Sequence, residues 1–170
     1  MKKSIIIIAA ILLMAGFTTN LMAQTSATTN AAAKILTGLT ITKNVDLNFG
    51  SMTIPTAATT VTLSPVGVRT SAGNITLLAQ APLATASAYS VTGDAGASYA
   101  ITLPSSSNIF LSPSGSIIVV DNFTSSKTGN TSTMSGSGTD SFTVGATINL
   151  ANGQYAGTYN GTFDVAIAYN

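Results

Sequence analysis

The sequence predicts an all-β protein folded as an immunoglobulin-like, Greek-key sandwich of about seven to nine strands. Apolar residues after position 31 alternate with polar ones at the two-residue period of a half-buried strand. No stretch in this part of the chain has the 3.6-residue period of a helix. Gly, Ser, Asn and Pro interrupt the apolar runs at short intervals, which is typical of antiparallel sandwiches and barrels.

The expected strands follow one another from the N-terminal side. The run from Ala33 to Ile41 is a possible first strand. Alternating residues then predict strands at Val45–Phe49, Val61–Leu63 and Tyr99–Leu103, each followed closely by a Gly or a Pro. The continuous apolar run Ile117–Val120 is typical of a strand that is buried on both faces.

The C-terminal part of the chain contains two longer predicted strands joined by a turn. Phe142–Leu150 alternates along its whole length, and Asn152-Gly153 is a strong hairpin signal. We expect Tyr159–Asn170 to form one continuous final strand, with larger apolar side chains on its inward face. These inward residues include Phe163, Val165, Ile167 and Tyr169. Before the hairpin, the Ser, Thr and Gly content of Thr124–Thr139 predicts a flexible loop.

The first 23 residues have the features of a secretory signal peptide. Lys2 and Lys3 precede an uncharged apolar run, Ile5–Phe17, and Ala23 is a small residue at the expected cleavage point. The run is shorter than the roughly 20 residues that a transmembrane helix requires, so we expect no membrane span in the mature chain. Residues 24–32 are small and polar, and we expect them to be a flexible lead-in to a single sandwich domain at residues 33–170. We therefore expect export to the periplasm, the cell surface or the extracellular medium.

The composition argues against an enzyme and against a cofactor or metal site. The chain has no His, no Cys and no Trp, and all five of its acidic residues are Asp. Without His or Cys the common transition-metal sites and the Ser-His and Cys-His nucleophile pairs are excluded. Six Lys or Arg residues against five Asp give a nearly neutral chain, which argues against nucleic acid as a partner.

Three segments carry a resemblance to a known family: Leu47–Gly50, Tyr89–Gly93 and Gly157–Tyr169. The last segment, with its Gly-x-Tyr-x-Gly-x-Phe-x-Val pattern, is the most specific of the three. From about Ala31 to Asn170 the chain resembles a family of secreted bacterial domains of unknown function. That family is itself similar to spore coat protein U and to pilins of the archaic chaperone–usher pathway.

The resemblance implies an exported, non-enzymatic structural subunit of the fimbrial or surface-coat kind. In such pilins a groove beside the last strand is filled first by a chaperone and then by an N-terminal strand of the next subunit. The implied groove residues here are Phe163, Val165, Ile167 and Tyr169. The implied donor strand lies around Ala31, Ala33 and Ile35. The implied partners are other copies of the chain and a periplasmic chaperone and usher.

Two alternatives to strand donation between copies remain open at this stage. If Ala33–Ile41 is the first strand of the domain itself, the edge of the last strand is completed within one molecule. This alternative is favoured by Gln24–Ala32, which offers only Ala among Thr, Ser and Asn, whereas donor strands carry larger apolar residues. The other alternative is a monomeric secreted binding module that holds a glycan or surface ligand through loops such as Thr124–Thr139.

Overall fold

The computed structural model describes residues 24–111 and 115–170, so the predicted signal peptide lies outside the described residues. The chain divides into two units, Met1–Lys34 and Ile35–Asn170. The described residues of the first unit, 24–34, contain no strand or helix. All eleven strands of the described chain belong to the second unit.

The predicted all-β class is confirmed, and the strands are linked by antiparallel pairing. The strands are β1 (Thr40–Val45), β2 (Thr59–Leu63), β3 (Arg69–Ser71), β4 (Ser87–Thr92), β5 (Ser98–Thr102), β6 (Ser106–Leu111), β7 (Ile117–Ser125), β8 (Thr131–Thr133), β9 (Thr139–Leu150), β10 (Tyr159–Asn160) and β11 (Ala166–Tyr169). One short 3-10 turn, Thr128–Asn130, precedes β8. In the described ranges, no helix has the length and apolar character needed to cross a bilayer.

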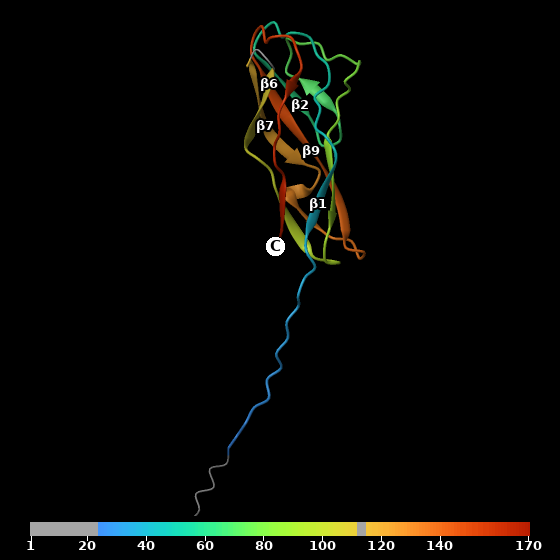
Figure 1. Ribbon diagram of the computed structural model, residues 1–170, viewed down its shortest axis with the longest axis vertical. Coiled ribbons are helices and arrows are strands. Elements are labelled where there is room, and N and C mark those ends of the chain that lie inside the picture. Colours follow the sequence, from blue (N-terminus) through green and yellow to red (C-terminus); the bar gives the residue numbers. More distant parts are fainter. Residues whose placement is uncertain (1–23, 112–114) are drawn as a thin grey trace, which may run out of the picture. The chain divides into compact units, whose positions relative to one another are not determined.

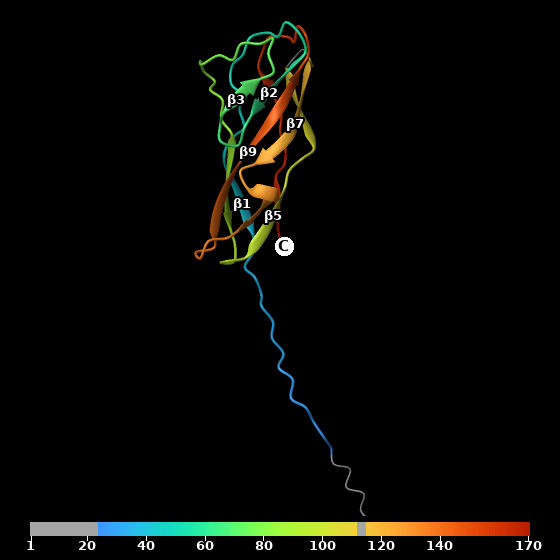
Figure 2. The same ribbon diagram turned by 180° about the vertical axis from the view of Figure 1, so that it is seen from behind.

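The strands form an eight-stranded sheet and a three-stranded sheet (Figures 1 and 2). The large sheet has the order β1-β4-β9-β7-β6-β10, and β2 joins it by pairing with both β9 and β3. The small sheet has the order β11-β5-β8. Strand β9 is long enough to pair with two strands on the same side, with β4 along residues 139–144 and with β2 along residues 146–150.

Apolar and polar side chains alternate along β9, and this explains why the strand lies in the middle of the large sheet. Its inward residues are almost completely buried: Phe142, Val144, Ala146, Ile148 and Leu150. Their burial fixes the register of β9 with its neighbours, because a slip by one residue would turn all of these side chains outward. Two buried clusters of side chains pack along this strand, and we call the regions around them the closed half and the open half.

In the closed half, two sheets face each other. The buried side chains come from β4 and β9 on one side and from β5 and the end of β8 on the other. They are Tyr89, Val91, Tyr99, Ile101, Met134, Phe142 and Val144. The rings of Tyr89 and Phe142 stack with centroids 5.1 Å apart. This half is therefore a complete sandwich in which each sheet covers the other.

In the open half, the large sheet is covered by irregular chain instead of by a second sheet. Its buried residues are Val61, Ile118, Val120, Ala146, Ile148 and Leu150. They lie under residues 46–58 and 72–86, which form no regular ladder but are joined by two isolated bridges, Asn48 with Thr85 and Met52 with Leu77, and by further backbone hydrogen bonds. The covering layer of this half therefore lacks a regular strand within the described residues.

Several expectations about local structure were wrong. The run Val45–Phe49 is not a strand, because β1 ends at Val45 and only Asn48 beyond it makes an isolated bridge. The run Ile117–Val120 is buried on one face only, since Ile117 and Val119 are exposed.

The segment Thr124–Thr139 is not a simple flexible loop, because β8 within it pairs with β5 and the following Met134 is buried at 3% exposure. The run Tyr159–Asn170 is not one strand, because β10 pairs with β6 in the large sheet and β11 pairs with β5 in the small sheet. This split also helps to explain why the strands outnumber the expected seven to nine.

Candidate binding cleft

The four predicted groove residues lie along the segment that crosses from one sheet to the other. All four are half-buried, while the residues between them are exposed. The ring of Phe163 lies 4.8 Å from that of Phe123, centroid to centroid, and Phe163 lines a cleft in the open half. Val165, Ile167 and Tyr169 pack against the core of the closed half instead. The structure therefore places one of the four in the cleft and the other three against the core of the closed half.

The C-terminal segment has an open edge. Strand β11 is an outer strand of the small sheet, and β10 is an outer strand of the large sheet. Each of them pairs with one neighbour, β5 and β6 respectively, and with no second strand of the described chain. An outer strand leaves backbone N–H and C=O groups available for pairing with another chain.

The cleft has a volume of about 810 Å³ and lies between two irregular segments. One side is formed by residues 46–55, which we call the loop wall. The other is formed by residues 154–163, which we call the C-terminal wall. No strand pairing within the described residues joins the two walls.

Apolar side chains form the floor of the cleft, and its lining includes polar residues as well, among them Asn48, Ser51, Thr53, Ser107 and Asn160. Its floor consists of buried residues from β7 and β9, namely Ile118, Val120, Ile148 and Leu150. Above them lies a ring of half-buried apolar side chains: Leu47, Phe49, Met52, Ile109, Tyr159 and Phe163. The charged residues of the lining, Lys43 and Asp46, are exposed and form an ion pair with each other. The cleft is therefore suited to an extended, mainly apolar segment that also needs backbone partners.

The loop wall is fixed by Arg69 of β3. One guanidinium nitrogen, Nη1, donates to the carbonyl oxygens of Phe49 and Ser51, at 2.7 and 2.8 Å. The other, Nη2, donates to the carbonyl oxygen of Leu78 at 2.7 Å. These side-chain hydrogen bonds add to the backbone hydrogen bonds by which Asn48 and Ser51 are joined to residues 78–85.

The C-terminal wall is fixed by a second set of polar contacts. The side-chain amide of Gln154 donates to the hydroxyl groups of Ser116 and Tyr159, both at 2.9 Å. The Tyr159 hydroxyl in turn donates to the carbonyl oxygen of Tyr155 at 2.9 Å. These contacts tie Gln154, Tyr155 and Tyr159 to one another and to Ser116.

The predicted donor residues lie outside every strand. Ala31, Ala33 and Ile35 precede β1, which begins at Thr40, and all three are exposed, Ile35 to 92%. The expectation that Ala33–Ile41 is a strand of the domain was wrong for residues 33–39. The sandwich begins near Thr37, whose carbonyl oxygen accepts a hydrogen bond from the Tyr169 hydroxyl at 2.9 Å.

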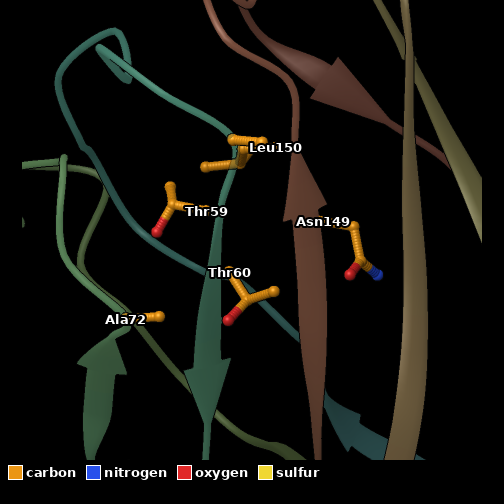
Figure 3. Close-up of a pocket in the computed structure, with 6 residues that line it drawn as sticks. Thr59, Thr60, Ala72, Asn149 and Leu150 are labelled. Atoms are coloured by element: carbon orange, nitrogen blue, oxygen red, sulfur yellow. The ribbon is translucent and has the colours of Figure 1, made fainter.

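A smaller hollow of about 380 Å³ lies where β2 meets the end of β9 (Figure 3). Its lining is small and uncharged, and includes Thr59, Thr60, Ala72 and Asn149. The Thr59 hydroxyl already donates to the carbonyl oxygen of Gly73, and the Asn149 amide donates to Asp121. Because its polar groups are largely engaged within the protein, this hollow is a weaker candidate than the cleft.

The most chemically distinctive cluster of the described chain surrounds Asp140 in the closed half. Lys127, Ser132 and Tyr99 all donate to its carboxylate, at 2.6 to 2.9 Å. Burial alone would raise the pKa of Asp140, but these hydrogen bonds outweigh burial and lower the pKa to about 2. Burial, together with the hydrogen bond to Asp140, raises the pKa of the Tyr99 hydroxyl. The cluster holds β8 and β9 together and contains no unpaired group that would act as a nucleophile or base.

No group of three or more metal-ligating side chains was found among the residues that the structure describes. Sequence reasoning missed the loop wall and its Arg69 clamp. The only available signal was that Arg69 is the single arginine of the chain and stands beside no acidic residue in the sequence.

Comparison with known proteins identifies a family. A family model described as a domain of unknown function, DUF4402, matches residues 39–169. The chain therefore belongs to this family. No curated protein and no solved structure matches the chain.

Proposed function

We propose that this member of the family is an exported, non-enzymatic structural subunit whose cleft accepts a β-strand from the N-terminal segment of another copy. Such a subunit would resemble pilins and surface-coat proteins. Its partners would be copies of itself and, during export, a periplasmic chaperone and usher. Its location would be the periplasm, the cell surface or the extracellular medium.

The observation that carries this proposal is the apolar cleft between two walls that no strand joins. A strand inserted there would pair with the open edge of the C-terminal segment and would place alternate side chains on the half-buried apolar ring. Main-chain hydrogen bonds then give affinity, and the alternate side chains give register. Insertion would also cover an edge that otherwise invites unspecific pairing.

The N-terminal segment is the best candidate for the inserted strand. Residues 24–39 belong to no strand, and Ile35 is a large apolar side chain that is almost fully exposed. Donation between copies is a head-to-tail contact, because the donating and accepting surfaces differ. Contacts of that kind produce open filaments unless the rotation between subunits closes a ring.

A single substitution separates the possible outcomes. We expect Ile35→Asp in the chain from residue 24 onward to remain a folded monomer, because its side chain is exposed, but to lose self-association in analytical ultracentrifugation. A synthetic peptide of residues 24–38 should then bind this variant and raise its Tm. The same peptide carrying Ile35→Asp is the control and should not bind.

Other results would overturn donation between copies. If Ile35→Asp strongly lowers the stability of a chain that is monomeric in either form, the strand is supplied within one molecule. If the variant is fully stable and ignores the peptide, no N-terminal strand enters the cleft, and a monomeric binding module becomes the better account.

A further inference from the structure

We infer that Arg69 is the positioning residue that holds the loop wall in the shape needed to receive a strand. This inference rests on the proposed function and deepens it, because it assigns the readiness of the cleft to one side chain. Arg69 does not line the cleft, so it would act through the residues that do.

The partners of Arg69 are unusual for a charged side chain. Its three contacts of 2.7 to 2.8 Å are all to backbone carbonyl oxygens, of Phe49, Ser51 and Leu78. The planar guanidinium presents donors in a fixed fork, so it sets the relative positions of these three carbonyl groups. Lysine carries its donors on a single atom and cannot reproduce that fork.

The backbone around Gly50 leaves room for the Arg69 guanidinium. Gly50 has φ +73°, a region that favours glycine, and a Cβ there would lie 2.7 Å from Nη1 of Arg69 and 2.9 Å from the backbone nitrogen of Ala84. The Asn48 side chain accepts a hydrogen bond from the Gly50 N–H at 2.7 Å and so supports the same turn. Glycine and the local Asn side chain thus let the wall bend around the guanidinium.

The clamp determines how the wall faces the cleft. It ties residues 49–51 and Leu78 back to β3, which lies on the side of β2 away from β9. Phe49, Gly50, Ser51 and Leu78 all line the cleft, so the clamp fixes this side of it. Without the clamp, we expect the apolar wall residues to move toward the floor and narrow the entrance, since burial of apolar surface favours collapse.

A pre-formed site binds more tightly because less order must be created on binding. The loop wall is irregular, and backbone hydrogen bonds tie it to residues 72–86, among them those of Ser51 with Pro82 and Leu78. Arg69 adds three side-chain hydrogen bonds, and these link both segments to β3. The C-terminal wall has its own contacts through Gln154 and Tyr159, and these do not involve Arg69. One backbone hydrogen bond, from the Gly153 N–H to the carbonyl oxygen of Pro55, joins the far end of the loop wall to the turn before the C-terminal wall. Residues 49–51, which Arg69 contacts, lie away from this bond in the sequence, so we expect a change at Arg69 to affect mainly the loop wall.

The test uses the Ile35→Asp chain as an acceptor that cannot donate and the peptide of residues 24–38 as the probe. Arg69→Met keeps the length of the side chain but removes its donors, and Arg69→Lys keeps the charge. We expect Arg69→Met to weaken peptide binding by about tenfold or more and Arg69→Lys to be intermediate, measured by calorimetry where each variant is folded.

Lys127→Met is the matched control, because it removes another half-buried cation, in the closed half and away from the cleft. It should lower Tm and leave the Kd for the peptide unchanged. If Arg69→Met binds like its parent, or if both variants weaken binding in proportion to their loss of stability, the inference is overturned. Failure of the parent to bind any peptide would instead count against the proposed function.

Hydrogen exchange of the peptide-free protein tests the positioning role separately and also serves if Arg69→Met does not fold. Arg69→Lys should speed amide exchange in residues 47–53 and leave exchange in residues 154–160 unchanged. Equal acceleration in both walls, or none in the loop wall, would contradict a local role for Arg69 whether or not the peptide binds.

Discussion

The closed half and the open half share β9 but complete their packing in different ways. In the closed half the buried residues of β9 are covered by β5 and β8, and a polar cluster around Asp140 joins the layers. In the open half the same strand is covered by irregular chain held in place by Arg69 and Gln154, with a cleft between the two walls. The comparison shows that a second sheet completes the closed half, whereas irregular chain covers the open half and leaves a cleft, which is where the proposed strand would enter.

The largest expected effect contrasts two phenylalanines. Phe142→Ala in the closed half removes a side chain that is 2% exposed and should lower the free energy of unfolding by about 3–5 kcal/mol. Phe163→Ala in the cleft removes a half-buried side chain and should cost about 1 kcal/mol, since much of it already meets water. Urea unfolding followed by circular dichroism measures both. If both substitutions lowered the free energy of unfolding equally, the two halves would not differ in how fully they bury their side chains.

The polar cluster of the closed half should give the next largest effect. Asp140→Ala leaves Lys127, Ser132 and Tyr99 without their shared acceptor, and we expect the free energy of unfolding to fall by about 2–3 kcal/mol. Asp121→Ala is the control, because this Asp on β7 accepts hydrogen bonds from the neutral side chains of Asn149 and Asn122. A larger loss in Asp121→Ala would show that the cluster is not the main polar contact of the fold.

The same cluster predicts how stability depends on pH. The pKa of Asp140 is about 2 in the folded protein and about 3.9 in an unfolded chain, so its ionised form favours folding. This contribution, about 2 kcal/mol, is complete above pH 4–5 and is lost as the pH falls toward 2. The difference in unfolding free energy between the wild type and Asp140→Asn should therefore shrink across that range. If this difference in unfolding free energy stayed constant with pH, ionisation of Asp140 would not be the source of the stabilisation.

The smallest expected effect sharpens the description of the open half. The natural N-terminal segment places small Ala33 two residues before Ile35, so it should fill the apolar ring incompletely. A peptide of residues 24–38 carrying Ala33→Ile should bind about tenfold more tightly, because it buries roughly two more methylene groups. Ala32→Ile is the control, since this position points to the opposite face of an extended strand. Equal gains from both peptides would exclude binding in a defined register.

The sequence predicted the fold class and the inward face of β9 because alternation depends only on burial, and burial is strong there. It failed at Tyr159–Asn170, since alternation continues unchanged when a strand leaves one sheet and joins another. It failed at Thr131–Thr133 because Thr and Ser suit strands and loops alike, and only pairing with β5 distinguishes them.

The cleft was only partly predictable. Phe163 was identified from its inward position, but the loop wall was not, because it is held by hydrogen bonds from the Arg69 side chain and from the irregular backbone of residues 72–86. A contact between a side chain and distant backbone leaves no periodic pattern. The lack of any strand at residues 33–39 was equally hidden, since Ala33, Ile35 and Leu39 alternate as a strand would.

Hydrogen exchange on the Ile35→Asp chain, with and without the peptide of residues 24–38, tests the central claim most directly. An inserted strand would give its hydrogen bonds to both sides of the cleft, so amides in residues 46–55 and 154–169 should become protected together. Exchange in the β4 and β9 residues of the closed half should stay as it was. Protection on neither side, or on a surface away from the cleft, would contradict the account.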